Sequence, residues 1–177
     1  MTTGLLGTYM PSEVKIVISA PSLGINHVLA NFSEDTFVNL ELPQDTWSEK
    51  ESIDGYTTRS HHLTKTMRAT ITLDQASKSN DVLSGLHAFD AKSLRGEGIF
   101  TCTIADKSGR SYAYSSQCYV KKPQNQEFGA QAGTRAWVIV MAGTDSFIGG
   151  NTMLDEDTIA TLEKLGIQID NSWKLSN

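Results

Sequence analysis

Histidines and cysteines are the residues of this sequence best suited to chemistry, and neither stands in a pattern that chemistry requires. His61 and His62 are adjacent, so on a strand they point to opposite faces, and no carboxylate or cysteine stands at metal-ligand spacing from them. His27 and His87 are isolated, which favours surface or hydrogen-bonded core positions over a general base. The chain lacks the GxSxG, HExxH, phosphate-loop and CxxC motifs. We therefore expect a protein that is not an enzyme and holds no metal or cofactor.

Cys102 and Cys118 lie on either side of an expected turn at residues 106–110. In a hairpin about that turn, Cys102 would pair with a residue near Tyr114. The opening ten residues lack the cation and the apolar run of a signal peptide, so we expect synthesis in the cytoplasm. Free, buried thiols are the interpretation we favour, and a disulfide, a redox pair or a ligand set is the alternative.

Two further clusters have both a structural and a functional interpretation. Residues 155–157 (DED) suit the cap and first turn of a helix, where carboxylates are favoured, better than a cation site. Tyr112, Tyr114 and Tyr119 fit a sheet surface. The alternative is a ligand platform, which would make the chain a monomeric β-sandwich binding module or a small hydrolase with a histidine base.

Alternation of apolar and polar residues predicts that the fold is mainly β, with half-buried antiparallel strands. Because both faces of segment 135–143 are apolar, we expect that strand in the centre of a sheet. One flanking helix is predicted at about 80–91 with Ser79 as its N-cap, and a second at 156–165 with Asp155 as its cap. The expected strands lie at 14–18, 26–32, 36–42, 67–73, 100–104, 111–120 and 135–143.

Length and charge narrow the class of protein. The 177 residues, 39% apolar and 20% charged, fit one globular domain. The net charge is −5 and the longest run of cations is Lys121-Lys122, which disfavours tight nucleic-acid binding. The longest apolar run, residues 136–142, is too short to span a bilayer, so no membrane partner is expected.

Residues 43–59 interrupt the alternation with a polar stretch that carries Trp47, Ile53 and Tyr56. We interpret this stretch as a long loop or a projecting hairpin. It is either a solvated connection or a surface for a partner, and large apolar side chains on a long loop favour the partner.

Four stretches carry a resemblance to a known family. They are residues 7–14 (GTYMPSEV), 79–87 (SNDVLSGLH), 122–137 (KPQNQEFGAQAGTRAW) and 147–151 (FIGGN). In this order and spacing the chain resembles the tail tube proteins of contractile-tailed bacteriophages over about residues 7–151. The lengthened loop around residues 47–56 and the tail 152–177 depart from that pattern.

The resemblance implies an antiparallel β-barrel or sandwich with one flanking helix, formed by residues 1–151, followed by a C-terminal helical extension, residues 152–177. It implies hexameric rings that stack into a hollow tube inside a contractile sheath and conduct DNA on ejection. The implied partners are the chain itself, the tail sheath protein, the baseplate initiator, the tail terminator, the tape measure protein and passing DNA held without specific binding. The protein would then lie in the virion tail after assembly in the cytoplasm of the bacterial host. A tube subunit of a tailocin or of a secretion-type injection system is the alternative within this class.

Candidate site residues follow from the same comparison. Arg135 is either a surface charge or a donor to an acidic residue such as Glu127, of its own or a neighbouring chain, and Trp137 fits the core. One face of the expected strand 67–73 and its end is either an ordinary solvent-facing surface or, as we favour, the lining of the lumen: Arg68, Thr70, Thr72 and Asp74. The candidates for subunit interfaces are Trp47, Tyr56, Glu127, Phe128, Gly129, Arg135 and Phe147.

Overall fold

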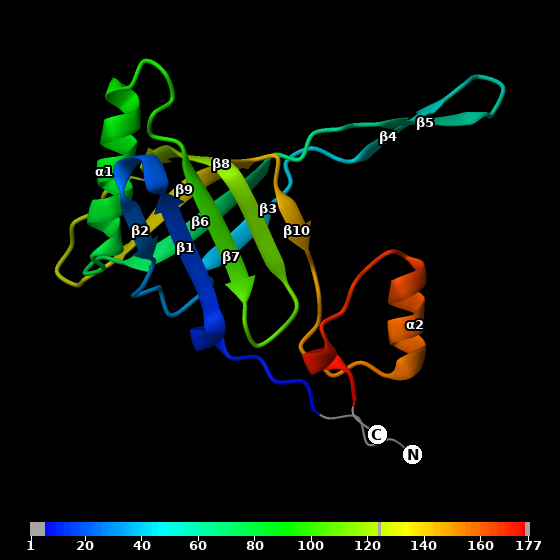
Figure 1. Ribbon diagram of the computed structural model, residues 1–177. Coiled ribbons are helices and arrows are strands. Elements are labelled where there is room, and N and C mark those ends of the chain that lie inside the picture. The colour runs from blue at the N-terminus through cyan, green and yellow to red at the C-terminus, as the bar shows by residue number, and fades with distance from the viewer. Residues whose placement is uncertain (1–5, 124, 176–177) are drawn as a thin grey trace.

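One curled antiparallel sheet, a projecting hairpin and two helices make up the fold (Figure 1). The computed structural model describes residues 6–123 and 125–175. Residues 1–5, part of the stretch in which we expect no signal peptide, lie outside the described residues. The mainly β class with its flanking helix and helical C-terminal extension is confirmed.

The large sheet has the strand order β2-β1-β7-β8-β9-β6-β3, with β10 beside β8. All of its pairings are antiparallel. β9 lies between β8 and β6, which confirms its predicted central position. The strands are β1 (Val14–Ala20), β2 (Ile25–Val28), β3 (Val38–Glu41), β6 (Met67–Asp74), β7 (Phe100–Asp106), β8 (Tyr112–Pro123), β9 (Thr134–Ala142) and β10 (Asp145–Phe147).

The sheet is an open sandwich, so the closed barrel among our expectations is wrong. β2 and β3 end the strand order and do not pair with each other. The chain between them bonds to two different strands: Leu29 N–H donates to Ile16 O of β1, and Ser33 N–H donates to Thr72 O of β6. The connection 29–37 therefore bridges the gap between the edges without closing the ladder.

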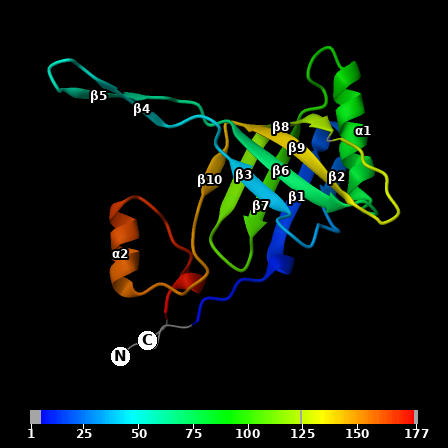
Figure 2. The same cartoon turned by 180° about the vertical axis from the view of Figure 1, so that it is seen from behind.

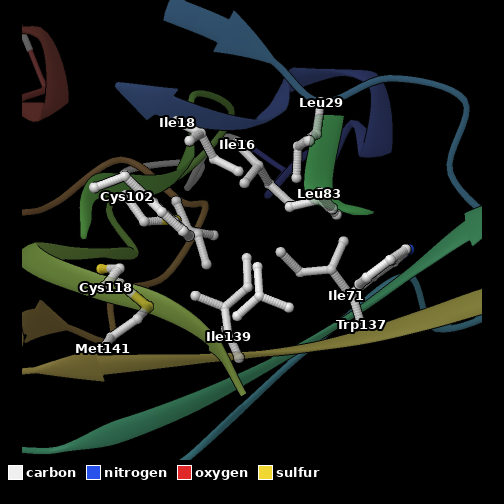
Figure 3. Packing of buried hydrophobic residues seen from close by; sticks show 14 of the residues in the cluster. Ile16, Ile18, Leu29, Ile71, Leu83, Cys102, Cys118, Trp137, Ile139 and Met141 are labelled. Atoms are coloured by element: carbon white, nitrogen blue, oxygen red, sulfur yellow. The ribbon is translucent and has the colours of Figure 1, made fainter. Parts of the chain in front are cut away.

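Burial of alternate side chains holds the sheet around one core. On β1, β6 and β7 every second residue is buried, as the sequence alternation predicts. Figure 3 shows Ile71 and Ile139 from β6 and β9 pointing toward Ile16, Leu29 and Leu83. On the other face of β9, Val140 is also buried, whereas Ala136 and Val138 remain half-exposed.

Helix α1 (Ser79–Lys92) covers the core side of the sheet with Leu83 and Leu86. The prediction that Ser79 is its N-cap is wrong, because Lys78 holds that position and Ser79 is the first helical residue. The Ser79 hydroxyl is buried, where it accepts the Ala30 N–H at 3.1 Å and bonds the His27 ring at 3.0 Å. The Ala30 N–H and the His27 ring need a hydrogen-bond partner, and this need overrides the preference of serine for the N-cap position.

Trp137 joins β9 to the first turn of α1, and its predicted place in the core is confirmed at 7% exposure. Its indole N–H donates to Asn80 Oδ1 at 2.9 Å, while Asn80 Nδ2 donates to Asp74 O at 2.9 Å. We expect Asn80→Ala to lower the free energy of unfolding by about 1–3 kcal/mol, because a buried donor and an acceptor lose their partner. Urea unfolding measures this, and Ser84→Ala on the exposed side of α1 is the control. Equal midpoints for the two variants would contradict the role of the bond.

The two cysteines are free and fully buried. The pairing of Cys102 with Ser115 agrees with the expected partner near Tyr114. A register shift between Phe100 and Cys102 nevertheless brings the thiols together (Figure 3). The hydrogen bond with Cys118 and burial raise the pKa of the Cys102 thiol, so it stays protonated and inert.

Two parts project from the sheet, and both views show them separated from α1 (Figures 1 and 2). The first is the hairpin of β4 (Trp47–Glu51) and β5 (Thr57–His61), within and just beyond the expected 43–59 stretch. The second is the extension with α2 (Glu156–Lys164), whose cap Asp155 accepts the Thr158 N–H at 2.8 Å as predicted. Gly166 ends that helix at φ +78°.

Candidate assembly surfaces

A largely polar surface covers the side of β6 that faces away from the core. The side chains that alternate with the buried ones on β6 are half-exposed and share one face. Neighbouring strands extend it, because Thr70 pairs with Asn39 of β3 and with Val138 of β9. Val138 pairs in turn with Lys122 of β8. We call this surface of β3, β6, β9 and the second half of β8 the outer face. It contains the four residues predicted to line a lumen: Arg68, Thr70, Thr72 and Asp74.

Charges of both signs lie on the outer face. Glu41 of β3 lies directly opposite Arg68. Asp74 lies at the end of β6, and Lys122 lies on β8. With the exposed Lys121 of β8, three cations and two carboxylates share the outer face, so its charge is mixed and its longest run of cations is Lys121-Lys122.

The β4–β5 hairpin exposes every residue of both strands. Its order comes from contacts within itself: the Arg59 guanidinium lies 3.9 Å from the centre of the Trp47 ring, and the His61 ring lies 4.6 Å from it. At the tip Tyr56 is 76% exposed and Ile53 is fully exposed. The interface candidates Trp47 and Tyr56 therefore lie on an arm whose tip is largely exposed within the described chain.

A second exposed segment, residues 125–133, connects β8 to β9, and we call it the Phe128 loop. Phe128 is 79% exposed, and the Arg135 guanidinium lies 5.4 Å from the centre of its ring. Arg135 also donates to Thr134 O at 3.1 Å, so within the chain it contacts Phe128 where we had allowed a bridge to Glu127. The structure thus brings Glu127, Phe128, Gly129 and Arg135 together at one end of the sheet. Their contact with a neighbouring chain remains a prediction.

An open apolar groove of about 930 Å³ extends from the start of β8 to the edge strand β3. Phe147, the last interface candidate, lines it together with β1, β3, β10 and the connection before β3. Glu34, Asp35 and Asp106 also line it, and no cation does so within the described ranges. The apolar and aromatic residues at its wall are Tyr9, Pro11, Val14, Phe32, Phe37, Val38, Leu40, Met67, Ile104, Tyr112, Phe147 and Ile148.

The turn between β7 and β8 ties the groove to the chain beyond β10. Burial disfavours the charged form of Asp106, but hydrogen bonds from Ser108, Asn151 and the backbone outweigh burial and lower the pKa of this carboxyl. Asn151 Nδ2 donates to Asp106 at 3.0 Å. A side chain at Gly149 would meet Arg110 Cβ at 2.5 Å, so only glycine fits that approach. Residues 149–151 therefore have a structural role, as the connection to the extension.

Arg110 anchors the extension to this turn. It donates to Thr152 O at 2.6 Å, and its guanidinium lies 4.8 Å from the centre of the Trp173 ring. Trp173 O accepts the Leu154 N–H at 2.9 Å, which closes the extension into a loop around α2. We expect Arg110→Ala to expose the extension, since a charged hydrogen bond of about 1.5–3 kcal/mol is lost. Hydrogen exchange at Leu154 should quicken about tenfold or more, while exchange in β6 stays unchanged. Arg135→Ala is the control. An unchanged exchange rate at Leu154 would contradict the anchoring role of Arg110.

Neither a catalytic group nor a metal cluster emerges from the geometry. Across residues 6–123 and 125–175, no three residues among His, Cys, Asp and Glu gather as a metal site would require. The hydrogen bond between His27 and Ser79 serves the contact between β2 and α1. In the same part of the chain, no helix combines the length and the hydrophobicity that crossing a bilayer demands.

The fold and these surfaces define a class: a mainly β structural protein with open sheet edges and exposed aromatic segments suited to binding other chains. The model of the family described as Bacteriophage PhiTE tail tube protein matches residues 6–149. "Structural protein ORF10" of Pseudomonas phage KPP10 is 40% identical over 170 residues, which cover 96% of this chain and 98% of that protein. The chain therefore belongs to the phage tail tube family; it is a structural subunit of the virion tail and not an enzyme.

The comparisons also bear on the extension. The family model ends before residue 152, whereas any 170-residue span of this chain includes all of α2. The similarity to the KPP10 protein therefore extends over the region of α2. Among solved structures, the tube-terminating cap of the anti-feeding prophage covers 81% of this chain and 93% of its own, with a TM-score of 0.49 and 6% identity. That similarity is too low to support an inference.

Sequence reasoning missed the groove and the strand β10. Five separate segments form the groove, so no local pattern announces it. β10 has three residues, too few to show an alternation. The signal that could have found it is the resemblance at residues 147–151, which begins at its last residue.

Proposed function

We propose that six copies of this chain close into a ring, that rings stack into a hollow tube inside a contractile sheath, and that the tube conducts DNA on ejection. The observation that carries the proposal is the outer face: four strands with charges of both signs, on one side of a sheet whose edge strand β3 has a strand partner, β6, on one side. Belonging to the tail tube family supports its role as the lumen surface.

The strand number fits the diameter of a DNA conduit. Six copies with four strands each supply about 24 strands, which at about 4.8 Å spacing and about 40° tilt close at a backbone diameter of roughly 48 Å. Side chains reduce this to about 40 Å. Duplex DNA, with a radius near 10 Å implied by its groove depths, passes with room for water.

The residues Arg68, Thr70, Thr72 and Asp74 line the lumen in this proposal. A lysine-rich or arginine-rich lining would hold the phosphates through counterion release, so a conduit must be neutral or negative. The pairing of Glu41 with Arg68 supports a neutral lining.

The remaining surfaces serve the contacts between subunits. The free edges of β2 and β3 are covered by neighbouring copies, which removes the hazard of open edges. The β4–β5 hairpin, with Trp47 and Tyr56, reaches the adjacent ring. Residues 1–151 form the tube domain, and residues 152–177 form an extension on the ring.

Other tail components complete the assembly. The sheath protein surrounds the tube, and the baseplate initiator and tail terminator bind its two ends. The tape measure protein fills the lumen before DNA does, and neither is bound specifically. Assembly takes place in the cytoplasm of the bacterial host.

Electron microscopy of the purified chain, alone and with a baseplate initiator, tests the proposal. We expect rings or tubes of sixfold symmetry. A chain that stays monomeric at high concentration, even with the initiator, would overturn it. That outcome would favour a binding module, for which Tyr112→Ala abolishes ligand uptake without changing the size of the particle.

A further inference from the structure

The Phe128 loop and the apolar groove are separate, complementary surfaces of one sheet. β8 begins at Tyr112, which lines the groove, and ends at Pro123, just before the loop. Its 12 residues rise about 3.3 Å each, so its two ends lie roughly 36 Å apart. Both views place the loop at the α1 end of the sheet, away from β10 (Figures 1 and 2). No described residue of the loop lines the groove of its own chain, and Phe128 is 79% exposed, so the groove is open to another copy.

We propose that the Phe128 loop of one copy docks in the apolar groove of the next copy, with Phe128 as the buried anchor. This inference rests on the proposed tube, and it assigns a particular contact within it. A contact between different patches on identical chains is heterologous, and such contacts generate closed rings or continuing stacks, as a tube requires.

The charges of the two surfaces favour the Phe128 loop as the occupant of the groove. The groove is lined by Glu34, Asp35 and Asp106, without a cation among the described residues. The loop is flanked by Lys121, Lys122 and Arg135, with Glu127 as the one acidic residue of positions 121–135. The competing apolar segments carry the wrong sign: residues 47–61 hold three carboxylates and two cations, and α2 holds three carboxylates and one cation.

The form of the two surfaces agrees with their charges. Phe128 is exposed for 79% of its surface, and the Arg135 guanidinium lies over its ring, so the loop presents an apolar tip with a cation beside it. The groove presents aromatic walls from Phe37, Tyr112 and Phe147 with Glu34 and Asp35 exposed at its border. Docking would bury the ring of Phe128 while the cations meet the acidic border.

Cross-linking in assembled tubes tests the contact. Gly129→Cys and Thr36→Cys, combined in one chain, place one thiol beside Phe128 and one in the groove, and a Cβ at position 129 would lie 4.0 Å from Gln131 O, an ordinary contact. Cys102 and Cys118 are fully buried and should not compete for a short bismaleimide. We expect a ladder of products beyond the dimer on a denaturing gel, because each copy would join two neighbours. Each single variant should give no ladder.

Leu94→Cys combined with Thr36→Cys is the matched control, because Leu94 is a fully exposed apolar residue on another loop beside cations. Tubes without a ladder from the Gly129 pair, or an equal ladder from the Leu94 pair, would overturn the docking and leave the tube intact. A wild-type chain that forms neither rings nor tubes would overturn both. As a second measurement, Phe128→Ser should raise the critical concentration for assembly at least tenfold without changing the melting temperature, and no rise would also count against the docking.

Discussion

Replacing residues 47–61 with Asn-Gly is expected to leave a folded monomer that forms no tubes. The ends of the hairpin are adjacent, since His62 N–H donates to Thr46 O at 2.8 Å, so a two-residue turn can join them. The core loses nothing, because both strands of the hairpin are exposed along their length. The melting temperature of the shortened chain should stay unchanged. The critical concentration for assembly, measured by sedimentation and electron microscopy, should rise at least about 100-fold, or about 2.7 kcal/mol.

We expect this loss of assembly because the large apolar side chains of the hairpin are exposed in the single chain. A lone two-stranded hairpin is marginally stable in water, and this one packs Trp47 only against Arg59 and His61 of the opposite strand. Ile53 and Tyr56 at the tip have no cover. Aromatic side chains such as Tyr56 are common anchors of protein interfaces, so we expect the tip to be covered in the assembled tail.

A point variant separates the tip from the arm. Ile53→Ser combined with Tyr56→Ser should reproduce most of the defect, whereas Leu165→Ser, an equally apolar change on the extension, should assemble normally. Normal tubes from the chain without residues 47–61 would show that the hairpin is not an assembly contact.

Local patterns predicted the elements well, and the long-range arrangement poorly. The alternation around Ile16 and Ile71 identifies half-buried strands because a strand turns every second side chain to the core. The apolar run around Ile139 identifies a central strand because both of its faces are apolar and need cover. Whether β2 meets β3 depends instead on the path of residues 29–37, which bond to β1 and β6. No local pattern encodes that path, so the barrel remained open against expectation.

The prediction that Ser79 is the N-cap was wrong for the same reason, since contacts from distant parts of the chain decide the role of this side chain. A serine before an amphipathic run is a good cap by itself, but here Ala30 and His27 approach from β2 and the chain after it, and they take the hydroxyl. The cap Asp155, far from the sheet, has no such competitor and was predicted correctly. Local rules therefore held where tertiary contacts are few.

For the candidate surfaces, the sequence supplied the residues and the structure supplied their grouping. Phe128 and Phe147 were both interface candidates, and only the fold places them at opposite ends of the sheet, one on a loop and one in a groove. The four lumen candidates needed only the period of one strand, and they do share a face. Their contact with a lumen is still a prediction.

Thr72→Lys is expected to turn a non-retaining tube into one that holds DNA. The substitution adds one cation per copy to the outer face at a position that pairs with Ala136, where no opposite charge lies across the strand. Six copies in each ring and many stacked rings would surround the duplex with lysines. Six to ten phosphate contacts lose about 10³–10⁵ in affinity between about 50 and 200 mM salt, so retention should be strong at low salt and vanish at high salt. Sedimentation of tubes with labelled duplex DNA measures it.

If the outer face lines the lumen, the protection of bound DNA depends on where the lysine is placed and not only on its charge. Ser84→Lys adds the same charge on the exposed side of α1, which covers the opposite side of the sheet, so its tubes should carry lysines outside the conduit. DNA bound by those tubes should be accessible to nuclease, whereas DNA in Thr72→Lys tubes should be protected along its length inside the tube. Thr72→Gln, which adds bulk without charge, should retain nothing. Equal nuclease sensitivity of the two lysine variants would place Thr72 outside the lumen, because enclosure by the tube is what separates the two positions.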